Sequence, residues 1–237
     1  MGDFAIVGEG ITDQIVLKNV LLGYFEARDP EPLIVFEQPP LDTTGAAGLP
    51  HPPGGWTLVV RYLRDRSYLQ ALQLHRYVVI QIDTDIAQDL GVPRTDGLTD
   101  EQFIGLIVGK LCSYVAPEDL AAVRDRLLFA IGLDEIECWL LPLVFDRSEK
   151  KLLQKITGCL ESINHKLRTS KELPLSTQAN GKDPKRYERV SAPLRQRKKL
   201  AHAATNPGFV KFLEELGNCV LDPLEAKAPP SDPPADP

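Results

Sequence analysis

The sequence lacks several patterns that would assign it to a class directly. No run of 18 apolar residues occurs, which argues against a membrane-spanning helix. The N-terminus has no charged segment followed by a long apolar one, so no secretion signal is expected. The four histidines show neither HxH nor HExxH spacing, so a zinc site is not expected. The four cysteines contain no CxxC pair, which predicts reduced, mostly buried thiols in a cytoplasmic protein.

Charge is unevenly distributed along the chain. The net charge of −6 taken alone argues against a nucleic-acid partner. However, residues 1–145 contain 10 Lys/Arg and 21 Asp/Glu, whereas residues 146–199 contain 15 and 6. An acidic region followed by a basic one would place metal-binding carboxylates beside a phosphate-binding surface. The alternative is that residues 146–199 form a pair of helices with a solvated basic face.

Residues 1–145 alternate short apolar runs with amphipathic segments, which is the pattern of an α/β domain. We expect about four mainly parallel strands flanked by helices, with a surface loop at the Pro- and Gly-rich residues 39–55. Residues 146–225 predict a basic helical extension, and residues 226–237 a disordered tail rich in proline and acid. The expected strands are 4–7, 33–36, 77–82 and 127–131.

Acidic residues follow two of these expected strands. Glu9, flanked by glycines, comes directly after the first strand, and Asp83 and Asp85 follow the third. In parallel sheets ligands bind outside the carboxyl ends of the strands, so these carboxylates would meet if the two strands are neighbours. Mg²⁺ prefers oxygen ligands and keeps several waters, so two or three carboxylates suffice. The alternatives are a surface charge at Glu9 and a turn formed by the two aspartates.

The two motifs resemble those of the TOPRIM domain in their order, spacing and strand context. They are GEGITD at residues 8–13 and DTD at residues 83–85. That domain is shared by topoisomerases, bacterial primases and nucleases of the overcoming-lysogenization-defect family. The resemblance covers about residues 3–140 and implies a Rossmann-like sheet. It further implies that Glu9, Asp83 and Asp85 hold Mg²⁺, or Mn²⁺ in its place.

A second, looser resemblance is to small stand-alone bacterial TOPRIM proteins, several of which occur with defence ATPases. It rests on EIECWLL at residues 135–141 and KDPKRY at residues 182–187. It implies Glu137 as a further metal ligand and Lys185 as a contact to the scissile phosphate. Glu137 could equally be a charge favoured at a helix N-terminus. The candidates for nucleic-acid backbone contacts, each with a solvated basic face as its alternative, are Lys182, Lys185, Arg186 and Arg189.

Together the motifs predict a metal-dependent nuclease that cleaves phosphodiester bonds, with Glu9, Asp83, Asp85 and Lys185 in catalytic roles. The family comparison implies an effector of bacterial phage defence. Any ATPase partner would be a separate chain, because no Walker A loop is present. The alternative function is a non-catalytic TOPRIM subunit that regulates or scaffolds a protein partner. DNA or RNA as substrate, and the oligomeric state, remain open at this point.

Overall fold

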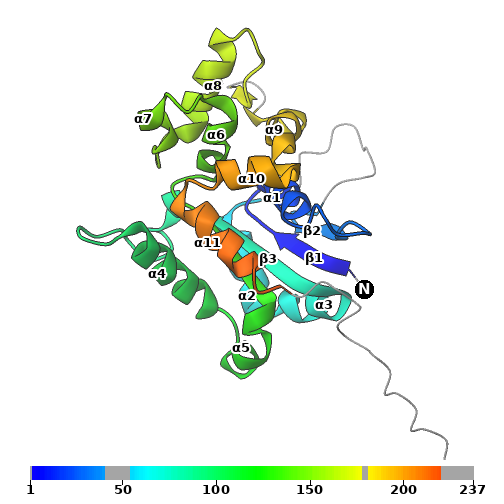
Figure 1. Cartoon of the computed structure of the whole chain (residues 1–237). Coiled ribbons are helices and arrows are strands. Elements are labelled where there is room, and N and C mark those ends of the chain that lie inside the picture. The colour runs from blue at the N-terminus through cyan, green and yellow to red at the C-terminus, as the bar shows by residue number, and fades with distance from the viewer. Residues whose placement is uncertain (1, 41–53, 178–180, 220–237) are drawn as a thin grey trace, which may run out of the picture.

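In a computed structural model, the structure describes residues 2–40, 54–177 and 181–219. The chain forms an α/β fold around a four-stranded, all-parallel sheet of strand order β2-β1-β3-β4, which confirms the predicted fold class (Figure 1). Residues 41–53 of the expected loop and the whole expected tail lie outside the described residues. The strands of the sheet are β1 (Gly2–Val7), β2 (Ile34–Gln38), β3 (His75–Asp83) and β4 (Leu127–Gly132).

Helices cover both faces of this sheet. A group of C-terminal helices extends beyond one end of the sheet, on the side opposite the amino terminus (Figure 1). In the described part of the chain, no helix combines the length and apolarity needed to cross a membrane. The helices before β4 are α1 (Ile11–Tyr24), α2 (Trp56–Arg64), α3 (Ser67–Leu74), α4 (Asp100–Cys112) and α5 (Pro117–Val123). Those after it are α6 (Leu141–Val144), α7 (Lys150–Leu153), α8 (Cys159–Thr169), α9 (Pro184–Ser191), α10 (Arg197–Ala203) and α11 (Pro207–Leu216).

Alternation along the strands divides the apolar residues between two cores. Phe4 and Ile6 of β1 join the core beneath α1 and the C-terminal helices, whereas Ala5 and Val7 join the core beneath α2 to α5. Because side chains alternate along a strand, an uninterrupted apolar run buries both faces at once. β3 follows the same rule and lies between β1 and β4 with both faces covered.

The C-terminal region shares the first of these cores. Trp139 is fully buried and stacks on two phenylalanines of α11, with ring centroids 4.7 Å from Phe209 and 5.9 Å from Phe212. Tyr187 of α9 and Leu200 of α10 belong to the same cluster as the β1 side chains. One continuous core therefore extends across the domain boundary predicted at residue 145.

The helical C-terminal region consists of short helices. The apolar pattern over residues 150–167 is split into α7 and α8 by a connection that ends at Gly158, whose φ of 59° lies in the left-handed region. The basic segment 185–199 is split into α9, a 3₁₀ turn (Ala192–Arg195) and α10, with Pro193 in the turn. Proline removes a backbone donor and clashes with the preceding turn, so the helix ends before it.

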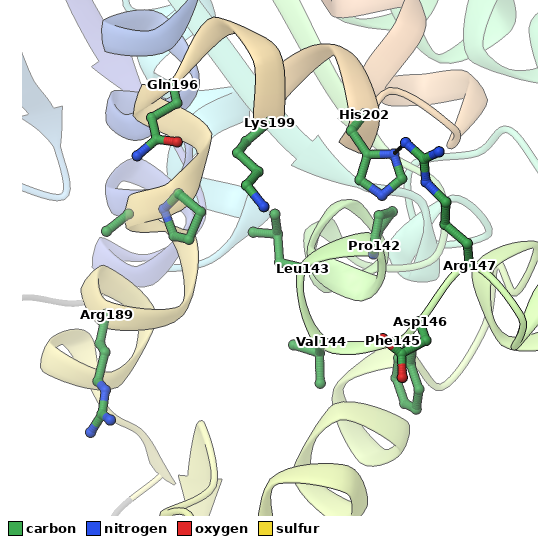
Figure 2. A pocket seen from close by; sticks show the side chains of 12 residues that line it. Pro142, Leu143, Val144, Phe145, Asp146, Arg147, Arg189, Gln196, Lys199 and His202 are labelled. Atoms are coloured by element: carbon green, nitrogen blue, oxygen red, sulfur yellow. Dashed lines mark hydrogen bonds between the residues drawn. The ribbon is translucent and has the colours of Figure 1, made fainter.

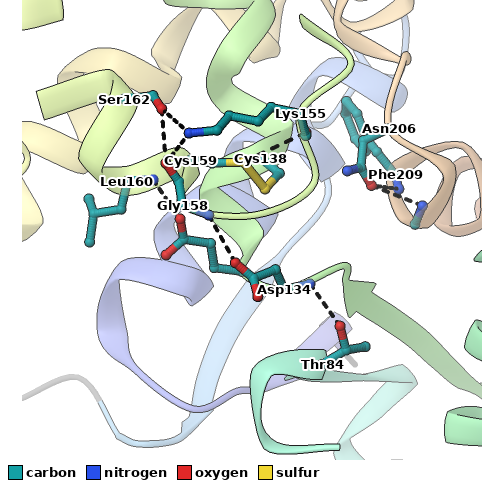
Figure 3. The surroundings of a disulfide bond; sticks show 12 residues. Thr84, Asp134, Cys138, Lys155, Gly158, Cys159, Leu160, Ser162, Asn206 and Phe209 are labelled. Carbon is teal, nitrogen blue, oxygen red and sulfur yellow. Dashed lines mark hydrogen bonds between the residues drawn. A yellow bond between two sulfur atoms is a disulfide. The ribbon is translucent and has the colours of Figure 1, made fainter. Parts of the chain in front are cut away.

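A disulfide joins Cys138 to Cys159, with an S–S distance of 2.08 Å (Figure 3). The prediction of reduced thiols is therefore wrong for this pair, while Cys112 and Cys219 are free. Two hydrogen bonds reinforce the link. Gly158 N–H donates to Asp134 Oδ2 (3.0 Å), and Leu160 N–H donates to Glu135 Oε1 (2.5 Å). The start of α8 is thus held against the segment 134–138, which includes Glu137.

Replacing both bonded cysteines with alanine should lower the free energy of unfolding by about 3 kcal/mol, because a loop of 21 residues is no longer closed in the unfolded chain. Urea unfolding followed by fluorescence of buried Trp139 would measure the loss. Cys112→Ala, which breaks no disulfide, should cost no more than about 1 kcal/mol. Equal effects of the two changes would show that the link contributes nothing.

Candidate metal and catalytic site

The candidate site lies where the direction of strand order reverses. β2 lies on one side of β1 and β3 on the other, with Val7 paired to Ile80. In open parallel sheets this switch point opens a crevice at the carboxyl ends of the strands, where ligands bind. Glu9 follows β1 by two residues, and Asp83 is the last residue of β3. The sequence argument required these strands to be neighbours, and they are.

A buried glutamine fixes Glu9 and Asp83 relative to each other. Gln81 Oε1 accepts from Glu9 N–H (3.0 Å), and Gln81 Nε2 donates to Asp83 Oδ1 (2.9 Å). Glu9 Oε1 in turn accepts from Asp83 N–H (2.7 Å). Sequence reasoning did not select Gln81, although a fully buried amide in an otherwise apolar strand was a visible signal.

The absence of a side chain at Gly132 leaves room for the Asp83 carboxylate. The two residues are paired across β3 and β4, and a Cβ added to Gly132 would lie 2.2 Å from Asp83 Oδ1. It would also lie 2.9 Å from Ile136 N, so the backbone on the other side cannot yield. Only glycine allows the carboxylate to occupy this position.

Gly132→Ala is expected to displace Asp83 and to lower the free energy of unfolding by about 1–3 kcal/mol, as overpacking does in a dense interior. Thermal unfolding and metal titration would follow the two effects. Gly105→Ala is the matched control, because a Cβ there meets no atom within 4 Å. An unchanged stability and an unchanged metal affinity in Gly132→Ala would contradict the close contact.

A second group of polar side chains lies next to Asp83. Glu137 is fully buried, accepts a short hydrogen bond from the Tyr187 hydroxyl and pairs through Oε1 with Lys182 Nζ at 2.7 Å. The same ammonium lies 3.9 Å from Asp13 Oδ1 on the first turn of α1. Lys182, predicted to contact nucleic acid, therefore has its charge committed to buried carboxylates instead. Asp13 and Tyr187 were not selected from sequence, although both lie inside the motifs at residues 8–13 and 182–187.

The electrostatics of this cluster favour protonation or a bound cation. Burial, reinforced by Asp13 and Asp85, raises the pKa of Glu9 to about 7, and burial with Glu137 nearby raises that of Asp13 to about 6. Asp83 has its pKa raised well above the usual range by burial and by the charges of Asp13, Glu137 and Glu9. Burial opposes the charge of Lys182, but Glu137 and Asp13 outweigh it and raise its pKa. A single ammonium thus faces several buried carboxylates.

One observation shows that the residues present fit a divalent cation. Glu137 Oε2 is buried and has no hydrogen-bond partner, which is costly for a carboxylate oxygen. Oxygen ligands of this kind suit Mg²⁺ or Mn²⁺. Glu9, Asp83, Glu137 and Asp13 are the residues that would hold such an ion, and in the described part of the chain no three of them bring their ligand atoms within 4.8 Å of one another. Asp13 thus joins the predicted set.

Asp85 lies at the edge of this cluster. Its backbone N–H donates to the Asp134 carbonyl (3.1 Å), and its pKa is raised by burial and then by the Asp134 charge. The ligand atoms of Glu9, Asp83 and Asp85 do not gather within 4.8 Å. Among the described residues, the trio of His, Cys, Asp or Glu side chains that meets this limit consists of Glu135 and the two bonded cysteines. The structure thus brings Glu9 and Asp83 together and leaves Asp85 on the flank.

The remaining predicted basic residues lie on α9. Lys185 is exposed, and only its backbone is engaged, where its N–H donates to the Asp183 carboxylate that caps the helix (2.9 Å). Arg186 pairs with Asp183 at 3.7 Å, and Arg189 with Glu172 at 3.9 Å. In the described residues no hydrogen bond or ion pair joins the Lys185 side chain to the carboxylate cluster. No contact with the cluster therefore supports its predicted catalytic role, which stays a prediction.

Comparisons of the chain with protein-family models, with curated protein sequences and with solved structures find no match. The case for a function therefore comes from the residues themselves. They form a buried acidic cluster at the switch point of a parallel sheet, with an orphaned carboxylate oxygen and one lysine.

Proposed function

We propose that the chain is a metal-dependent nuclease of the TOPRIM type that hydrolyses phosphodiester bonds in nucleic acid. The observation that carries the proposal is the gathering of Glu9, Asp83, Glu137 and Asp13 at the carboxyl edge of β1 and β3. Asp13, Asp83 and Glu137 are titratable yet buried, Glu9 is partly buried, and Glu137 Oε2 lacks a partner. Buried carboxylates destabilise the fold when no cation is bound, and such an arrangement is typical of a functional site.

Each protein group has a role that its contacts support. Gln81 and the Asp83 N–H hold Glu9 in place, and Tyr187 holds Glu137. Without a metal, burial raises the pKa of the Glu9 carboxyl to about 7, and a bound cation would favour its charged form. A bound Mg²⁺ or Mn²⁺ would supply a Lewis acid and a nucleophilic hydroxide. Lys182 pairs with Glu137 and would offset part of the negative charge of the carboxylates around the cation.

Substrate would be held through its backbone. Lys185, Arg186 and Arg189 all project from α9, directly after Lys182 in the chain. Contacts of this kind bind phosphates and carry little sequence information, so selectivity would come from substrate structure or from a partner. Both DNA and RNA satisfy this chemistry.

The test is a cleavage panel. The wild-type protein is incubated with transfer RNA, plasmid DNA and single-stranded DNA, each with Mg²⁺, Mn²⁺ or EDTA. Cleavage of at least one substrate that depends on the added metal supports the proposal and names the substrate. Cleavage that is unaffected by EDTA, or no cleavage of any substrate, would overturn it.

One observation favours a second candidate, a non-catalytic subunit that regulates or scaffolds a partner. Lys182 already neutralises part of the cluster, and among the described residues the carboxylates of Glu9, Asp83 and Asp85 do not meet within 4.8 Å. Buried ion pairs can serve to fix one conformation. Calorimetric titration separates the two, because a structural cluster would bind neither Mg²⁺ nor Mn²⁺.

A further inference from the structure

A large cavity lies between α6, α9, the 3₁₀ turn (Ala192–Arg195) and α10, with a volume of about 660 Å³ (Figure 2). This size falls within the roughly 300–1,000 Å³ of small-molecule sites. None of its lining residues belongs to the carboxylate cluster. A ligand in this cavity would therefore leave Glu9, Asp83 and Glu137 free, so the inference does not depend on the proposed nuclease activity.

Positive charge dominates the lining of the cavity. Arg147, Arg189 and Lys199 contribute three cations, against the single carboxylate of Asp146. Figure 2 shows the Lys199 side chain directed into the gap between the wall formed by α9 with its following turn and the wall formed by α6. Within the described part of the chain, no carboxylate forms an ion pair with Lys199 or Arg147. Arg189 pairs with Glu172 at 3.9 Å, so Lys199 and Arg147 are the cations whose charge is left to favour an anion in the cavity.

Arg147 also determines which ring nitrogen of His202 carries the hydrogen. Its Nη2 lies 3.0 Å from His202 Nδ1, and an arginine can only donate, so Nδ1 accepts. The neutral imidazole then carries its hydrogen on Nε2, which makes that atom a donor. Arg147, Lys199 and His202 together offer an array of donors and no competing acceptor, which suits the oxygens of a phosphate group.

Apart from Gln196, the rest of the lining is apolar. Leu143 and Val144 of α6 and Ala192 and Pro193 of the opposite turn are partly exposed side chains that face the cavity. A bare inorganic anion would leave these surfaces in water, whereas a flat organic group between the walls would cover them. The combination of several cations with two apolar walls matches a phosphate ester that carries a ring.

We propose that this cavity binds a nucleoside phosphate, with its phosphate on Lys199 and Arg147 and its base between α6 and the 3₁₀ turn. The ligand is either a free nucleotide or one unit of a nucleic-acid strand, since both present the same chemistry. In either case the site is distinct from the carboxylate cluster.

The test is calorimetric titration in EDTA at low salt, with AMP, GMP, inorganic phosphate and a single-stranded 10-mer as separate probes. The protein is used in the wild-type form and as Asp83→Asn. Nucleotide binding that is the same in both forms is independent of the carboxylate cluster and of the nuclease proposal. We expect nucleotide binding at least about tenfold tighter than phosphate binding, because only the nucleotide covers the apolar walls. Binding of AMP or GMP identifies a free nucleotide, and binding of the 10-mer alone identifies a strand.

Lys199→Met and Arg147→Met are expected to weaken binding about tenfold each, as the loss of one charge-assisted hydrogen bond does. Lys198→Met is the matched control, because Lys198 is an exposed neighbour that does not line the cavity. Circular dichroism would show that the variants keep the fold. No binding of any probe, or an equal loss in Lys198→Met and Lys199→Met, would overturn the proposal.

Discussion

Asp83→Asn and Glu9→Gln should each lower metal-dependent cleavage about 1,000-fold or more, since a bound metal supplies several kcal/mol of charge stabilisation. The amides can keep the existing geometry, because Asp83 Oδ1 and Glu9 Oε1 both act as hydrogen-bond acceptors. Only the negative charge is lost. Cleavage rates at saturating Mg²⁺, together with calorimetric Mg²⁺ titration, would measure both consequences.

The same variants should be more stable than the wild type at pH 8 in EDTA. Burial raises the pKa of both carboxyls, so the folded state holds their protons to higher pH than the unfolded chain does. Their stabilising contribution is complete at acidic pH and is lost as the pH rises through the folded pKa, about 7 for Glu9. An amide removes this loss and should add about 1–3 kcal/mol at pH 8.

Asp89→Asn is the matched control, because Asp89 is an exposed aspartate outside the cluster. It should leave the cleavage rate and the stability at pH 8 unchanged. Cleavage within tenfold of wild type in both Asp83→Asn and Glu9→Gln would show that these carboxylates are not the reaction centre. Loss of cleavage with a loss of stability would indicate a merely structural role.

The sheet and half of the site could be predicted because their signals are local. The uninterrupted apolar run that ends at Asp83 can only be a strand buried on both faces, and β3 has that place. The glycine-flanked Glu9 lies directly after another short apolar run. Once β1 and β3 are neighbours, parallel geometry brings the two carboxylates to one edge.

The other half depends on contacts between distant parts of the chain. Lys182 lies 45 residues after Glu137 in the sequence, and neither residue indicates its partner. A basic segment on its own predicts a solvated or phosphate-binding face. The Lys182 side chain is 38% exposed, but its ammonium pairs with the buried carboxylates because they need a counter-charge. The disulfide between Cys138 and Cys159 could likewise not be predicted, because the spacing of cysteines alone does not specify their pairing.

Lys182→Met should lower the free energy of unfolding by about 1–2 kcal/mol at pH 8 in EDTA, because it leaves the buried Glu137 charge uncompensated, while water at the 38% exposed Lys182 side chain screens part of the loss. Glu137 has no exposed surface, and Lys182 Nζ lies 2.7 Å from its Oε1. Methionine keeps the length and apolar character of the lysine stem, so the change mainly removes charge. Urea unfolding followed by Trp139 fluorescence would measure the loss.

The loss should depend on pH in a definite direction. Asp13 and Glu9 have folded pKa values raised to about 6 and about 7, and in both cases the Lys182 charge opposes the rise. Without that charge, both carboxyls hold protons to still higher pH. At pH 5 Asp13 and Glu9 are largely protonated in either protein, so the ammonium then acts mainly on its direct partner Glu137. The difference between wild type and Lys182→Met should therefore be smaller at pH 5 and grow through pH 6–8.

Lys185→Met provides the comparison, because Lys185 is an exposed lysine in the same segment whose side chain makes no ion pair with the described residues. It should be neutral at every pH. Millimolar Mg²⁺ should restore part of the stability of Lys182→Met at pH 8, because a divalent cation replaces the missing charge beside Glu137 and Asp13. If the loss is the same at pH 5 and pH 8, Lys182 does not act on Asp13 and Glu9. If Mg²⁺ restores none of the stability, the orphaned Glu137 oxygen no longer indicates a cation site.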